Sequence, residues 1–246
     1  MTDDDFWECP PEQGLAWYGE FRLTLIEPPF PAGGGGALPA HDPERAREFA
    51  ACLGTVDTVV DEVDRIEATE RPPFSTRADL DLVGVGCWGT VTEINDPALV
   101  YTGGTLPLVE QADELAARFP GAVLIGSATI DHPMTYGTHV IRHPAGARLF
   151  AAGWSGEGDW DLEGTPHEVV DAFGIDPDDL ERRGIDLDAA PGSFPWESLT
   201  RLVLGHVSPL LRTGRTLSVF RVRHTEEATG DLEDTWMGEP DGFEEF

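Results

Sequence analysis

Runs of apolar and β-branched residues predict strands in six segments of the chain. These segments are 21–26, 80–94, 122–126, 138–143, 147–154 and 216–223. The glycines between 84 and 89 indicate that 80–94 is either two strands or one bent strand. Short turn signals separate the third, fourth and fifth of these segments, so the stretch 122–154 predicts an antiparallel β-meander.

Apolar residues at helical spacing, preceded by capping residues, predict helices between the strands. Asp42 followed by Pro43, and Thr165 followed three residues later by Glu168, are typical helix beginnings. The expected helices span about 42–54, 107–119, 165–174, 176–184 and 195–208.

A further helix is expected directly after Thr55. Val56, Val59, Val60 and Val63 follow the spacing of a single apolar stripe on a helix, and the intervening residues are mostly acidic. The pattern therefore predicts an amphipathic helix whose acidic side faces water.

These elements indicate an α+β fold with mostly antiparallel strands packed by capped helices. One domain is expected over residues 1–224. The segments 54–61 and 164–171 share their spacing, which indicates either two similar β-plus-helix halves, about 20–95 and 96–224, or coincidence. A mobile acidic tail is expected over 225–246.

The charge of the chain excludes several classes of function. It has 46 acidic residues against 16 basic ones, a formal net charge of -30, and all its basic residues are arginines. Functions that rely on a lysine amine are therefore excluded, including Walker-type phosphate binding, protein-kinase chemistry, pyridoxal Schiff bases and serine–lysine acyl transfer. The negative charge also repels phosphate backbones, so no nucleic-acid binding is expected.

The cysteines and the start of the chain bear on its location. Cys9, Cys52 and Cys87 form no C-x-x-C pair, so they indicate neither a disulfide framework nor a zinc site. The first residues lack the features of a signal peptide, and no apolar run approaches the roughly 18 residues that span a bilayer. We therefore expect a cytoplasmic protein with no membrane partner, no cofactor and no metal.

One segment matches a nucleotide-binding motif literally. Residues 84–89 read G-x-G-x-x-G, but a dinucleotide site needs a helix to begin at this loop, and the segment Thr90–Ile94 that follows reads as a strand. The glycines are therefore interpreted as allowing close strand packing around Trp88.

A polar cluster around the middle of the chain is the candidate catalytic site. It consists of Asp131, His132, His139, Arg142 and His143, and histidines with a carboxylate are typical of metal or acid–base chemistry. On a strand the two alpha carbons of His139 and His143 lie about 13 Å apart, too far to share one zinc ion. His132 and His139 flank a predicted turn and make a better pair, with Asp131 beside them. The alternative is that these are ordinary half-exposed residues paired with carboxylates.

Aromatic residues near both ends are candidate binding anchors. Trp7, Trp17 and Trp236 stand among acidic residues, and interface hot spots favour tryptophan. Two function classes stay open: an acidic interaction protein whose partner has a basic surface, and a lysine-free small-molecule enzyme of the hydrolase or isomerase type that uses the cluster at 131–143. The first is preferred because the chain has no recognisable catalytic motif.

Three short segments carry a resemblance to other proteins. Asp79–Leu82, Gly86–Gly89 and Leu217–Arg221 resemble segments of an uncharacterised conserved family of high-GC actinobacteria. The resemblance implies no activity and no catalytic residues.

Overall fold

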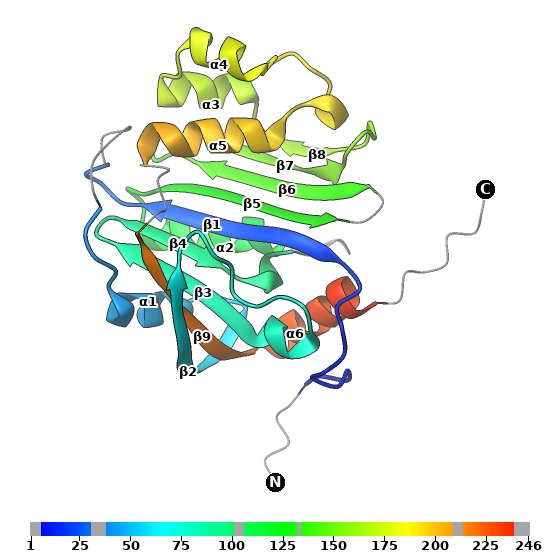
Figure 1. The fold of residues 1–246 in the computed structure, drawn as a ribbon. Coiled ribbons are helices and arrows are strands. Elements are labelled where there is room, and N and C mark those ends of the chain that lie inside the picture. Colours follow the sequence, from blue (N-terminus) through cyan, green and yellow to red (C-terminus); the bar gives the residue numbers. More distant parts are fainter. Residues whose placement is uncertain (1–5, 31–37, 101–105, 132–133, 209–213, 239–246) are drawn as a thin grey trace, which may run out of the picture.

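The residues that the structure describes form nine strands in one continuous antiparallel sheet at the centre of the molecule. The computed structural model describes residues 6–30, 38–100, 106–131, 134–208 and 214–238. The strand order is β2-β9-β3-β4-β1-β5-β6-β7-β8 (Figure 1). The strands are β1 (Tyr18–Ile26), β2 (Val56–Glu67), β3 (Leu82–Trp88), β4 (Val91–Asn95), β5 (Val123–Asp131), β6 (Thr135–Arg142), β7 (Arg148–Trp154), β8 (Asp161–Glu163) and β9 (Thr216–His224). The expected α+β class and antiparallel pairing are confirmed.

The described residues also form six α-helices. They are α1 (Pro43–Ala50), α2 (Pro107–Arg118), α3 (Pro166–Phe173), α4 (Pro177–Arg183), α5 (Trp196–Val207) and α6 (Glu226–Leu232). Asp42 caps α1 by accepting hydrogen bonds from two backbone N–H groups, and Thr165 caps α3 in a capping box with Glu168. All five helices expected from capping patterns are present, although α1 ends at Ala50 instead of near Gly54.

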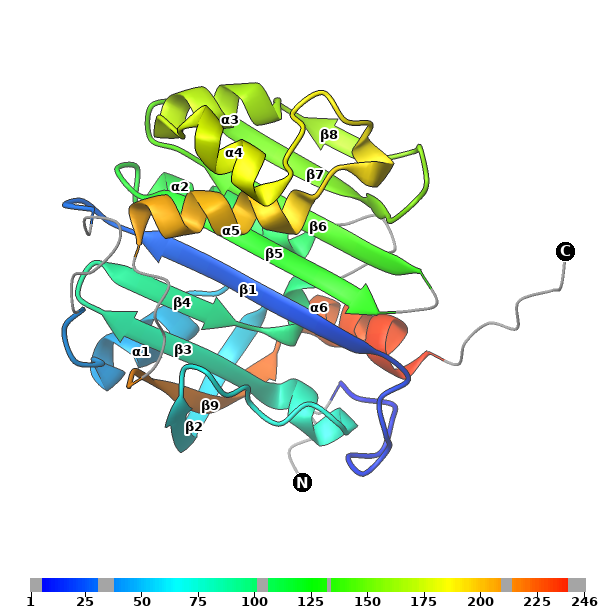
Figure 2. The same cartoon turned by 45° about the horizontal axis from the view of Figure 1, so that its top comes forward.

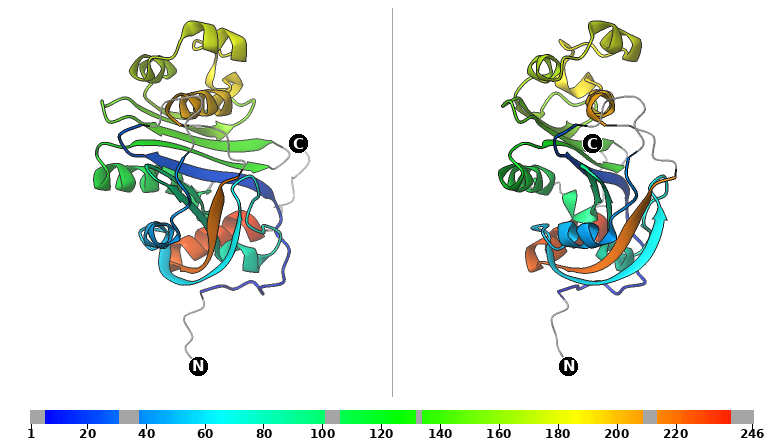
Figure 3. Two further views of the ribbon diagram at one scale, coloured as in Figure 1. Left: turned by 60° about the vertical axis from the view of Figure 1, so that its left-hand side comes forward. Right: turned by 90° about the vertical axis from the view of Figure 1, so that its left-hand side faces the viewer.

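Alternation along the strands gives the sheet two different faces. On β1, Leu23 and Leu25 point to one face, here called the first face, and Arg22 and Thr24 point to the second face. Helices α1, α2 and α6 pack on the first face (Figures 1 and 3). Helix α5 packs across β5 and β6 on the second face, and α3 packs on β7 beside it.

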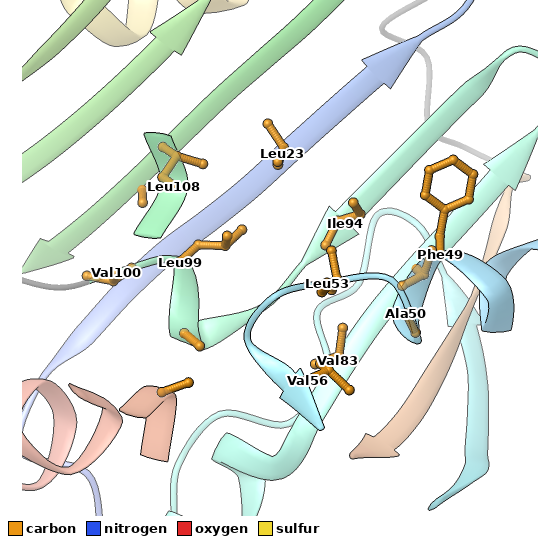
Figure 4. Close-up of a cluster of buried hydrophobic side chains, with 14 of the residues drawn as sticks. Leu23, Phe49, Ala50, Leu53, Val56, Val83, Ile94, Leu99, Val100 and Leu108 are labelled. Atoms are coloured by element: carbon orange, nitrogen blue, oxygen red, sulfur yellow. The ribbon is translucent and has the colours of Figure 1, made fainter. Parts of the chain in front are cut away.

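The main core fills the space between the first face and its helices. Leu23 and Ile94 from the sheet meet Phe49 and Leu53 from the α1 segment and Leu108 from α2, and all are buried (Figure 4). A second core lies under α3 and α5 on the other face. Each face of the sheet therefore has its own hydrophobic layer, which anchors the strands from both sides.

The predicted meander is confirmed. β5, β6 and β7 pair in sequence order, with Ser127 opposite His139 and His139 opposite Ala151. Helix α2 packs against β5 and β6 on the first face, as expected for the helix at 107–119. No part of 122–130 is helical.

The helix expected after Thr55 is wrong. Residues Val56–Glu67 form β2, the edge strand beside β9, and the pairing contains register shifts at three places. Since 54–61 contributes to a strand and 164–171 to helix α3, the shared spacing of these two segments does not reflect a repeated structure.

The expectation that a mobile tail begins at residue 225 is also wrong. Thr225 caps helix α6, and the chain continues as a π-helical turn over Glu233–Met237. Leu232 and Trp236 are completely buried in the main core. Residues 239–246 lie outside the described part of the chain.

No helix in the described part of the chain combines the length and the apolar character needed to cross a membrane.

Candidate functional site

The members of the histidine cluster that the structure describes do not lie at one place. His139 lies on the second face beneath Trp196 of α5, with ring centroids 6.5 Å apart, while Arg142 points to the first face and binds Asp113 at 2.7 Å. His143 packs against Phe173, with ring centroids 4.7 Å apart. His132 lies outside the described residues.

Asp131 is therefore separated from the histidines that the structure describes. It stands on the second face at the end of β5 and accepts a hydrogen bond from Thr135 at 3.3 Å. Among the described residues, no group of three or more His, Cys, Asp or Glu side chains is placed to hold a metal ion. The described members of the cluster therefore do not form a joint site, and the pairing of His132 with His139 stays a prediction.

The candidate aromatic anchors are largely packed inward. Trp236 is fully buried, which rules it out as a surface anchor in this conformation. Trp17 is half-buried against the main core. Trp7 is also half-buried, donates to Asp81 at 3.0 Å and lies under the guanidinium of Arg77.

The glycine motif at 84–89 has the structural role expected of it. β3 turns directly into β4, so no helix begins there, and Gly89 takes a positive φ of 63° at the turn. The Trp88 ring lies over Gly86, where an added Cβ would come within 2.2 Å of it. Gly86 is needed to make room for this ring.

A groove opens on the second face where the helices stop. None of the helices that the structure describes crosses β1, β4 and β3 on this face (Figure 2). The groove has a volume of about 690 Å³ and is bounded by α5 on one side and by residues 71–74 on the other. Its floor is formed by alternate residues of four neighbouring strands.

The floor of the groove is polar. β1 contributes Arg22 and Thr24, β4 contributes Glu93 and Asn95, and β5 contributes Ser127. Thr24 lies opposite Glu93, and Arg22 lies opposite Ser127. The Glu93 carboxylate lies 3.5 Å from the Arg22 guanidinium and accepts a hydrogen bond of 3.3 Å from Asn95.

Several of these polar groups are withdrawn from water. Glu93 is only 6% exposed, and Thr24 is 3% exposed with no hydrogen-bond partner for its hydroxyl oxygen among the described residues. On the α5 side, Thr200 and Ser208 are also buried. A sheet face that is merely solvated carries polar side chains that reach water, so this floor differs from an ordinary wet face.

One end of the groove is apolar and the other is open and charged. At the apolar end, Trp88 donates from its indole N–H to the Thr216 carbonyl at 3.0 Å, and the Arg215 guanidinium lies 5.6 Å from its ring centroid. At the other end, Glu20 forms an ion pair with Arg71. Tyr18 stands beyond them and is 74% exposed.

The groove is much less acidic than the chain as a whole. Four arginines and five carboxylates line it, against 16 basic and 46 acidic residues in the sequence. Arginine and carboxylate form ion pairs inside the groove: Arg22 with Glu93, Arg71 with Glu20, and Arg201 with Glu197. The groove therefore presents paired charges of both signs.

His139 supports the groove from beneath α5. Its Nδ1 lies 3.2 Å from the Ser127 hydroxyl oxygen, and Gly137 leaves room for its ring. Burial lowers the pKa of His139 to about 4, so the ring is neutral at pH 7.

A second network of hydrogen-bonded polar side chains lies outside the groove, between β2, β9 and the start of α1. The Cys87 amide donates to His41 Nδ1 at 3.2 Å, His41 Nε2 lies 2.9 Å from the Ser218 oxygen, and Ser218 donates to Glu62 at 2.7 Å. A hydrogen bond from Arg65 is the main reason that the pKa of Glu62 falls to about 2. A serine nucleophile gives its proton to a histidine. Ser218 instead is fully buried and donates to a carboxylate, so this network is structural.

Sequence reasoning did not find the groove, although one signal was present. In β1, the polar residues Glu20, Arg22 and Thr24 alternate with Phe21, Leu23 and Leu25. This period of two marks one polar side of a central strand. The same signal in β4 is the pair Glu93 and Asn95, and only the sheet order places the two strands side by side.

Comparison with known protein families gives a match over almost the whole chain. The sequence profile of a protein family matches residues 6–239, which includes every strand and helix of the fold. No curated protein and no solved structure matches the chain.

Proposed function

Because the chain belongs to DUF6333, a family of unknown function, we propose a function from the groove itself: the protein binds a polar small molecule on the open part of the second face. The observation that carries this proposal is the buried Glu93 carboxylate on the groove floor, paired with the half-buried Arg22. Glu93 is 6% exposed beside Arg22 on a part of the sheet that none of the described helices covers.

Three physical points support the proposal. Burying a carboxylate costs free energy that a purely structural site would avoid with an apolar residue, and the rest of the second face does use apolar residues under α3 and α5. The volume of about 690 Å³ lies in the range of small-molecule sites. The Thr24 hydroxyl has no hydrogen-bond partner within the described part of the chain, so a polar partner there would be favourable.

We expect Leu204→Trp to abolish retention of small molecules by filling the groove. Leu204 is half-buried on the groove side of α5, so the larger ring enters the space above the floor. The measurement is mass spectrometry of compounds retained after the purified protein is incubated with a metabolite extract and desalted. His206→Trp is the matched control, because His206 is exposed on the same helix and does not line the groove.

The expected result is that the wild type and His206→Trp retain the same compound and Leu204→Trp does not. If the wild type retains nothing, or if both variants retain the compound equally, the groove is not the binding site.

The exposed edge of β2 favours a second candidate, binding of a protein partner with a basic surface. This edge strand carries exposed Val60 (56%) and Val63 (39%) among acidic residues such as Asp61 and Asp64. The acidic field speeds encounter with a basic partner, and the association rate should fall as ionic strength rises. The aromatic anchors expected from the sequence do not contribute here, because Trp236 is buried.

Asp61→Lys tests this second candidate. We expect it to slow association with a basic partner isolated from the native host severalfold, whereas Asp188→Lys, which changes the net charge equally at another site, leaves the rate unchanged. Asp188 is highly exposed near the end of α4. Equal rates for the two variants, measured by surface plasmon resonance at low salt, would exclude the β2 edge.

A further inference from the structure

The geometry points to a neutral, polyhydroxylated molecule, a short saccharide, as the ligand of the groove. This inference rests on the proposed function and names the chemistry of the ligand. Its support comes from the paired charges, from the mixture of donors and acceptors on the floor, and from an exposed aromatic ring at the open end.

The charges of the groove oppose a strongly charged ligand. An anion would have to compete with Glu93 for Arg22, with Glu20 for Arg71 and with Glu197 for Arg201. It would also approach against a net charge of -30. A cation would meet arginines beside each of these carboxylates. A neutral ligand avoids both costs.

The polar floor suits hydroxyl groups, which both donate and accept. A carboxylate only accepts and a guanidinium only donates, whereas an amide or a hydroxyl does both. Glu93, Arg22 and Asn95 lie next to one another, so acceptors and donors alternate over short distances. Adjacent hydroxyls of a sugar ring can bond to such a row at the same time, while each protein ion pair stays intact.

Tyr18 supplies the apolar surface that a sugar ring also needs. It is the first residue of β1, lines the groove at its open end and is 74% exposed, more than any other large hydrophobic residue that the structure describes. An exposed aromatic ring with a polar tip is typical of a contact surface. The carbon-bound hydrogens of a sugar face can stack on this ring. Asp131, which lies opposite Tyr18 in the sheet, can accept a hydrogen bond from a sugar hydroxyl.

The ligand would then lie along the groove between its two ends. The apolar end near Trp88 and Val91 is buried, and the open end at Tyr18 and Glu20 reaches solvent. A groove open at one end accepts a chain of two or three sugar units more readily than a compact molecule that fills a closed pocket.

Titration calorimetry and saturation-transfer NMR with defined probes test this inference. The neutral probes are maltotriose, cellotriose and xylotriose, and citrate is the anionic probe. We expect one neutral trisaccharide to bind with little dependence on salt, because no net charge is involved. Tyr18→Ala should weaken this binding about fivefold to tenfold. Tyr18→Phe, which keeps the ring, should stay within about twofold of the wild type.

The Leu204→Trp variant and one further control separate the outcomes. Phe6→Ala removes another exposed aromatic ring, outside the groove, and should not change binding. If no trisaccharide binds while citrate binds and Leu204→Trp abolishes that binding, the small-molecule site stands and the saccharide inference fails. If a trisaccharide binds but neither Leu204→Trp nor Tyr18→Ala weakens it, the sugar lies elsewhere and the inference is overturned. Binding of none of the probes also overturns it.

Discussion

Trp236→Ala is expected to destabilise the protein by about 3–5 kcal/mol, because it removes a large ring from a closely packed site. The ring is completely buried, lies 4.9 Å from the centroid of Phe74, and donates from its indole N–H to the Pro97 carbonyl at 3.2 Å. It also fills the space above Gly19, where an added Cβ would be 2.5 Å from it. The substitution therefore leaves a cavity and removes one of the two hydrogen bonds to the Pro97 carbonyl, which still accepts from the Val100 amide at 3.3 Å.

Chemical denaturation monitored by circular dichroism measures this effect. Tyr18→Ala is the control, because Tyr18 is 74% exposed and its loss should change stability by less than about 0.5 kcal/mol. Truncation before Thr225 should have a still larger effect than Trp236→Ala, since it also removes α6 and the buried Leu232. A loss of less than about 1 kcal/mol for Trp236→Ala would contradict the packing described here.

The packing of this segment was missed because acidic residues obscured a helical pattern. Ala228, Leu232, Thr235 and Trp236 follow the spacing of one buried helix face. Acids fill most positions between them, and composition alone indicated a solvated tail. The spacing was the better signal, because it is the geometry of the helix that decides which side chains reach the core.

The strand β2 was mistaken for a helix for a definite geometric reason. A regular strand buries every second residue, but each register shift in the β2–β9 pairing inserts an extra residue. The more buried positions of β2 become Val56, Val59, Glu62 and Ile66, a spacing close to that of a helix. The β-branched valines of this segment have a high strand propensity. This propensity predicts the segment better than the spacing of its apolar residues does.

The meander, the capped helices and the fold class could be predicted because their signals are local. Capping residues, turn glycines and apolar runs lie within a few residues of one another in the sequence. The groove depends instead on the sheet order, which brings Glu93 of β4 beside Arg22 of β1 across about seventy intervening residues. Its partner wall on α5 comes from much later in the chain, so no local pattern could reveal the site.

Acidification from pH 7 to pH 4 is expected to remove about 3 kcal/mol of stability through His139 alone. Burial lowers the pKa of this ring from its ordinary value of 6.5 to about 4, and this difference corresponds to roughly 3 kcal/mol. Between these two values the unfolded chain binds a proton that the folded protein does not. Stability therefore falls as pH falls through this window, by up to about 1.4 kcal/mol per pH unit, and this contribution is complete near pH 4.

His139→Gln isolates this contribution. Glutamine stays neutral at every pH and can still bond to the Ser127 hydroxyl, so the variant should lose about 3 kcal/mol less than the wild type over the same pH range. The free energy of unfolding is measured by urea denaturation at several pH values from 7 to 4. Burial also lowers the pKa values of His41 and His143, and the carboxylates titrate too, but both proteins share these groups and their effects cancel in the difference. If the free energy of unfolding depends on pH in the same way for the wild type and His139→Gln, protonation of this ring carries no desolvation cost. The ring would then reach water next to the groove.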